Sequence, residues 1–95
     1  MYHTADDLTR KTCAIITRID LPLITLGAIL KYFSQRSIGV QSLQMHHINP
    51  AEATLTILCQ VERDRVRHTW YSLGKIEGIL ELEMLESRGG SLLKI

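Results

Sequence analysis

The strictest pattern in the sequence is the alternation of apolar and polar side chains over residues 54–62. Leu55, Ile57, Cys59 and Val61 share one parity, while threonine, glutamine and glutamate occupy most of the other. Successive side chains of a β-strand point to opposite faces, so this alternation predicts a strand with one buried face. The other face of its sheet is left to meet solvent or a partner.

Three further strands are predicted around this one. Residues 12–20 and 38–48 form the first two, and residues 79–86 alternate again as the last. Asn49 and Pro50 begin a short stretch of turn-forming residues between the second strand and residues 54–62. These two strands therefore read as a β-hairpin.

Two segments follow the helical period instead. In the first, Pro22 fits the opening turn and Asp20 is a plausible cap. Its predicted buried face consists of Leu23, Leu26, Leu30 and Phe33. The second covers residues 63–77, ends before Gly78, and has a predicted buried stripe of Val66, Trp70, Leu73 and Ile76.

The resulting order, β-α-β-β-α-β, is that of ferredoxin-like α+β domains. We therefore expect a four-stranded antiparallel sheet with the first and third strands in its centre and both helices on one face. The expected organisation is a flexible N-terminal segment (residues 1–11), one folded domain (residues 12–88) and a C-terminal tail (residues 89–95).

The end of the first helix and the second strand carry a family resemblance. The sequence F-S-Q-R-S-I-G-V-Q-S-L, beginning at Phe33, resembles the pattern F-S-Q-R-G-Y-N-I-E-S-L of ACT domains in the small regulatory subunit of acetolactate (acetohydroxyacid) synthase. The ACT-like pattern extends over residues 13–86. The resemblance implies a non-catalytic regulatory domain of branched-chain amino acid biosynthesis, without a cofactor, that modulates a catalytic large subunit.

The resemblance also implies where a small branched-chain amino acid would bind. The site lies at a dimer interface, where the first loop of one subunit meets the second strand of its neighbour. On this sequence it comprises Asp20, Leu21, Leu23, Ile24, Thr25, Leu26, Ile38, Gly39 and Val40.

One departure from the family keeps a second function open. The family has a glycine just before the helix, and here that position holds Leu23 or Ile24, depending on the alignment. A bulky side chain there blocks close approach of the backbone to a ligand. The alternative is a stand-alone ACT-like dimerisation or interaction module with a degenerate ligand site.

A homodimer is expected; the alternative is that a large catalytic partner takes the same sheet edge and the isolated chain is monomeric. The second strand lies at the sheet edge, and no lysine or proline protects residues 40–48 against pairing. Two-fold pairing of this edge closes it. The predicted interface residues are Tyr32, Val40, Leu43 and Met45.

Composition and motifs narrow the remaining function classes. The formal net charge of +1 argues against a nucleic-acid partner. No apolar run is long enough to span a bilayer, so no association with a membrane is expected. The N-terminus lacks the apolar core of a signal peptide, so we expect a cytoplasmic protein. No catalytic set of side chains is apparent, and the protein is not expected to be an enzyme.

No metal site is predicted either. His46 and His47 are adjacent on a strand and point to opposite faces. Cys13 and Cys59 are expected to be reduced and buried. Arg63, Arg65, Arg67 and Lys75 give the second helix a basic side, which is either a solvated face or a docking surface.

Overall fold

The computed structural model describes residues 10–86 and 91–94. Its elements, in chain order, are β1 (Arg10–Asp20), α2 (Pro22–Arg36), β2 (Gly39–Asn49), β3 (Glu52–Glu62), the short 3₁₀ helix η1 (Arg63–Arg65), α3 (Val66–Gly74), β4 (Ile79–Glu86) and β5 (Ser91–Lys94). Most of the predicted N-terminal segment lies outside the described residues, and its last two residues, Arg10 and Lys11, belong to β1.

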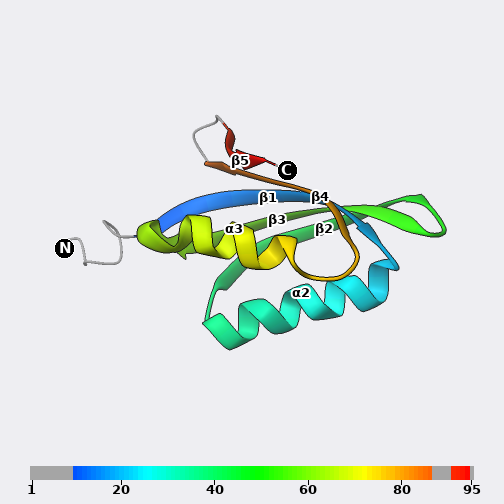
Figure 1. Cartoon of the computed structure of the whole chain (residues 1–95), viewed down its shortest axis with the longest axis horizontal. Coiled ribbons are helices and arrows are strands. Elements are labelled where there is room, and N and C mark those ends of the chain that lie inside the picture. The colour runs from blue at the N-terminus through cyan, green and yellow to red at the C-terminus, as the bar shows by residue number, and fades with distance from the viewer. Residues whose placement is uncertain (1–9, 87–90, 95) are drawn as a thin grey trace.

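The strands form one antiparallel sheet in the order β2-β3-β1-β4-β5 (Figure 1). The predicted β-α-β-β-α-β order is confirmed, with β3 and β1 in the centre of its four strands. The fifth strand comes from the segment expected to be a tail. It pairs with β4, placing Lys94 opposite Glu83, and so covers an edge that would otherwise expose unpaired backbone groups.

The core lies between one face of the sheet and the two helices, which lie on the same side of it in Figure 1. The predicted parity of β3 is confirmed, because every second residue from Ala53 to Val61 is buried, and β1 shows the same alternation from Cys13 to Ile19. Ile29 and Phe33 of α2, Leu73 of α3, and Leu82 and Met84 of β4 complete the core.

Cys13 and Cys59 are buried and not joined by a disulfide, as predicted. The structure adds that they are direct cross-strand partners in the β1–β3 pair. Burial raises the pKa of both thiols, that of Cys59 to about 12. Both sulfurs therefore stay protonated in the folded protein at neutral pH.

The predicted buried face of α2 is wrong in part. The buried residues are Pro22, Thr25, Ile29 and Phe33. Leu23 and Leu30, by contrast, are exposed. The cause is local, since the hydroxyl of Thr25 donates to the carbonyl of Asp20 and fixes the rotation of the first turn.

The second helix is shorter than predicted. Residues 63–65 form η1, and the chain leaves α3 after Gly74. Its stripe is nonetheless largely as expected, because Leu73 is buried while Val66, Trp70 and Ile76 contact the core. Gly78, with φ of 103°, lies in the turn before β4 rather than directly after the helix.

Candidate functional site at the sheet edge

The loop between β1 and α2 is held from two sides. The amide of Asp20 donates to the carbonyl of Gly78 at 2.7 Å, which ties the loop to the turn before β4. The amide of Leu21 donates to the carbonyl of Ala51 at 3.2 Å, which ties it to the turn of the β2–β3 hairpin. The predicted ligand loop is therefore a fixed part of the fold.

Leu21, rather than Asp20, occupies the N-cap position of α2. The Asp20 carboxylate accepts the amide of Leu21 at 3.0 Å and does not reach the first turn, so the predicted cap is wrong. Leu21 has a φ of 47°, in the left-handed region that leucine rarely adopts. This residue joins strand and helix at the cost of local backbone strain.

The first turn of α2 leaves backbone donors uncapped and apolar side chains in solvent. No side chain of the described residues caps the helix, and Pro22 at its start has no N–H to offer. Leu23 and Ile24 are 76% and 73% exposed, respectively. In a single chain, whichever of them corresponds to the family glycine extends outward and fills no pocket.

The remaining ligand residues lie at the far end of α2. Ile38 is half-buried, while Gly39 and Val40 are exposed at the start of β2. Leu26 is half-buried against the core and Thr25 is fully buried. One chain therefore does not bring residues 20–26 and 38–40 together, and a shared site requires a second copy.

The predicted dimer residues divide between two flanks of α2 and β2. Leu43 and Met45 are half-buried on the core-facing side of β2, opposite Ile57 and Leu55 of β3. Tyr32 lies elsewhere, in a cleft that it lines together with Thr69 of α3. Leu30 precedes Tyr32 by two residues, and side chains two apart on a helix point roughly 200° apart. Because Tyr32 faces α3, Leu30 faces away from α3.

Most of the exposed large apolar residues belong to the β1–α2 loop, α2 and β2. Six exposed residues make up this group: Leu21, Leu23, Ile24, Leu30, Val40 and Ile48. Only Leu58, Tyr71 and Leu80 are exposed large apolar residues elsewhere in the described chain. Sequence reasoning missed Leu30 and Ile48 as surface residues, because their spacing does not distinguish a core face from an interface.

The opposite face of the sheet carries a charged group that the sequence did not reveal. The Arg18 guanidinium contacts Glu52 at 2.8 Å and Glu81 at 3.1 Å. The hydrogen bond to Glu52 raises the pKa of Arg18 most, and the hydrogen bond to Glu81 raises it further. A shallow cavity of about 310 Å³ lies beside Arg18. The Arg18 guanidinium is already paired with Glu52 and Glu81 and is not available to bind an anion there.

Within residues 10–86 and 91–94, no three histidine, cysteine, aspartate or glutamate side chains gather closely enough to hold a metal ion. Neither α2 nor α3 combines the length and apolar character of a membrane-crossing helix.

No protein-family model matches the sequence, and no curated protein matches it. Among solved structures, the chain is similar to the solution structure of the C-terminal domain of the MgtC protein from Mycobacterium tuberculosis. The TM-score is 0.65 and the identity 10%, over 81% of this chain and 87% of that one. The similarity shows a shared ACT-like β-α-β-β-α-β fold. The narrower resemblance to the acetolactate synthase small subunit stays a prediction.

Proposed function

We propose that this chain is a non-catalytic ACT-like interaction module that pairs with a second copy of itself along β2. The observation that carries the proposal is an open edge strand beside an uncovered apolar flank. In the described part of the chain β2 pairs only with β3 over its 11 residues, whereas the strand at the opposite edge, β5, is only 4 residues long. Long unprotected edges of this kind invite pairing with another strand.

The topology places the apolar flank next to that edge. Helix α2 connects β1 to β2 across β3, while α3 connects β3 to β4 across β1. The side of α2 that faces away from α3 is therefore the side nearest β2. Leu23, Leu26 and Leu30 follow that side at helical spacing.

A two-fold axis near Gln44 gives a self-complementary interface. It sets Leu43 opposite the partner's Met45, and both side chains lie on the core-facing side of β2. The two α2 helices then approach each other with their leucine flanks inward. A stable interface of this kind buries on the order of 1,200–2,000 Å² in total.

Sedimentation at micromolar concentration tests the pairing. We expect a dimer for the unmodified chain and monomers for Leu43→Lys and Ile48→Lys, because lysine charges interrupt the apolar seam. Ile48 is already 56% exposed, so its substitution spares the fold. The matched control is Leu58→Lys, which places the same charge on an exposed leucine of the central strand β3. A monomeric unmodified chain would refute the proposal.

A second candidate function, binding of a branched-chain amino acid effector, is favoured by the same pairing. Antiparallel pairing sets the start of one β2 beside the end of the other, and the loop at Leu21 is hydrogen-bonded to the turn that follows β2. Residues 38–40 of one copy then lie beside the uncapped start of α2 in the other. Uncapped helix amides suit a carboxylate.

Calorimetry with valine, leucine and isoleucine separates the two candidates. A regulatory subunit of a catalytic acetolactate synthase partner should bind at least one of them saturably. Leu23→Gly or Ile24→Gly should then strengthen binding by opening the backbone to the ligand. If neither the unmodified dimer nor the two variants bind any of the three, the effector function is excluded and the interaction module remains.

A further inference from the structure

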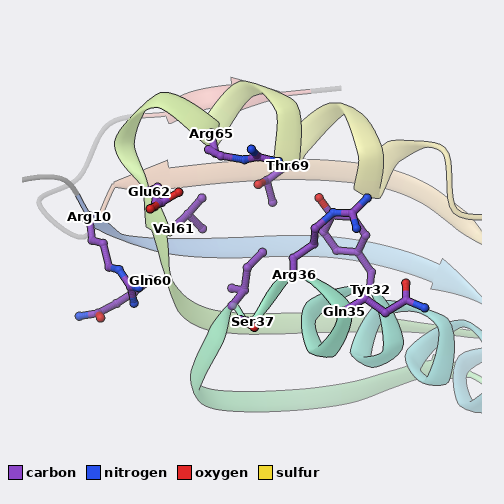
Figure 2. Close-up of a pocket in the computed structure, with 11 residues that line it drawn as sticks. Arg10, Tyr32, Gln35, Arg36, Ser37, Gln60, Val61, Glu62, Arg65 and Thr69 are labelled. Atoms are coloured by element: carbon purple, nitrogen blue, oxygen red, sulfur yellow. The ribbon is translucent and has the colours of Figure 1, made fainter. Parts of the chain in front are cut away.

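A cleft of about 440 Å³ lies between the last turn of α2 and the start of α3 (Figure 2). It is at the end of α2 opposite the β1–α2 loop, and none of residues 20–26 lines it. Its volume is in the range of small-molecule sites, about 300–1,000 Å³. The residues that matter for its chemistry are Tyr32, Arg36, Ser37, Gln60, Arg65 and Thr69.

Two guanidinium groups border the cleft from different elements. In Figure 2, Arg36 reaches from the end of α2 over Tyr32, and Arg65 runs along the start of α3 toward Thr69. The Arg36 guanidinium carbon lies 5.3 Å from the centre of the Tyr32 ring, a cation–π contact that holds it in place. No described residue forms an ion pair with either arginine.

The surrounding groups favour an anion further. No acidic residue lies in the first turn of α3, and no described side chain caps that helix, while Asp64 of the preceding η1 does not line the cleft. The hydroxyls of Ser37 and Thr69 and the amide of Gln60 add neutral donors to the lining. Among the described residues that line the cleft, Glu62 is the one acid, and together with Arg36 and Arg65 it leaves an excess of positive charge.

We propose that this cleft binds a small organic dianion, a phosphate monoester or a dicarboxylate, between Arg36 and Arg65. The guanidinium group donates two parallel hydrogen bonds to two oxygens of either a carboxylate or a phosphate. Ile38 and Val61 provide the apolar part of the lining against which the carbon skeleton of the ligand packs. The predicted second helix has a basic side, of which only Arg65 lines the cleft, and Arg36 of α2 joins it there.

Titration of the full chain, followed by the amide signals of its NMR spectrum, tests the proposal. The probes are inorganic phosphate, glycerol 3-phosphate and succinate. We expect saturable shifts centred on Ser37, Gln60 and Thr69 with glycerol 3-phosphate or with succinate, and the one that binds identifies the ligand class. Arg36→Gln and Arg65→Gln should each weaken that binding by about tenfold or more, as loss of a charged hydrogen bond does.

Arg67→Gln is the matched control, because Arg67 is exposed on α3 and does not line the cleft. It removes the same charge and should leave the affinity unchanged. Equal weakening by all three substitutions would mean diffuse attraction by net charge and would overturn the proposal. Absence of saturable shifts with every probe at millimolar concentration would overturn it as well.

Discussion

Ser37 ends α2 in a conformation that usually belongs to glycine. Its φ is 55°, and the amide of Ile38 donates to the carbonyl of Phe33 at 3.0 Å while that of Ser37 donates to Ser34 at 3.3 Å. These two bonds form a Schellman motif, which reverses the chain toward β2. The ACT pattern that this segment resembles has a glycine at this position.

Ser37→Gly is therefore expected to stabilise the protein by up to about 1 kcal/mol, after the entropy cost of glycine in the unfolded chain is subtracted. Urea unfolding monitored by circular dichroism measures the change. Ser34→Gly, one turn earlier in regular helix, should instead destabilise by about 0.5–1 kcal/mol. Equal losses for both variants would show that the left-handed conformation at Ser37 carries no strain.

The paired thiols of Cys13 and Cys59 make stability depend on pH in the alkaline range. Burial raises the pKa of Cys59 from 9.0 to about 12 and raises that of Cys13 as well. The folded protein thus keeps protons that the unfolded chain releases. Their contribution to stability is complete below pH 9 and is lost as the pH rises through the folded pKa values.

We expect the free energy of unfolding to fall by up to about 1.4 kcal/mol per pH unit for each thiol above pH 9. Unfolding measured in urea between pH 7 and pH 11 detects the slope. The double variant Cys13→Ala, Cys59→Ala lacks both thiols and should lose stability less steeply. Parallel slopes for the two proteins would assign the alkaline loss to other groups.

At the scale of elements, the junction of α2 with the turn before β4 depends on one close contact. A Cβ atom added to Gly78 would lie 2.1 Å from the Oγ1 atom of Thr25, and Gly78 has a φ of 103°. Thr25 cannot move aside easily, because it is buried and its hydroxyl is bonded to Asp20. The glycine therefore allows the helix and the turn to approach.

Gly78→Ala should destabilise the protein by about 3 kcal/mol, from overpacking and an unfavourable φ together. Thermal and urea unfolding measure the loss. Gly27→Ala is the control on α2, where an added Cβ meets nothing within 4 Å and should stabilise the helix by about 1 kcal/mol. In a Thr25→Ala background the cost of Gly78→Ala should shrink, and an unchanged cost would contradict the proposed clash.

The strands could be predicted from the sequence because each has one buried face and a period of two. Residues 79–86 match β4, and the hairpin turn has the predicted chemistry, with the Asn49 carboxamide accepting the amides of Ala51 and Glu52. The rotation of α2 could not be predicted. This helix carries two apolar stripes, one through Ile29 and one through Leu30, and the spacing of residues does not tell which stripe meets the core.

The remaining differences come from contacts between distant segments. Pairing of Cys13 with Cys59 depends on the register of β1 against β3, and the Arg18 ion pairs depend on two neighbouring strands. The cleft at Arg36 and Arg65 exists because the end of one helix lies beside the start of another. Local sequence patterns contain none of this information, whereas they suffice for the order of the elements.

At the scale of the whole molecule, the two edges of the sheet differ. Strand β5 covers β4 over a short stretch, with Leu93 opposite Met84, while β2 at the other edge has no cover in the described chain. An edge strand as short as the 4 residues of β5 is a poor template for pairing, so we expect association through β2 alone, which stops at a closed pair. A molecule with two open edges can continue to add copies at both sides.

Ending the chain after Glu86 should therefore turn the proposed dimer into larger assemblies, because removal of the 4-residue β5 leaves the 8-residue β4 as the second edge strand. Sedimentation and light scattering at micromolar concentration measure the change in mass. Leu43→Lys in the shortened chain should limit these assemblies to dimers, since only the β4 edge is then free to pair. A shortened chain that remains a dimer would show that β4 does not need β5 as cover. A shortened Leu43→Lys chain that still forms large assemblies would show that they do not depend on β2, and would weaken the case for pairing along that strand.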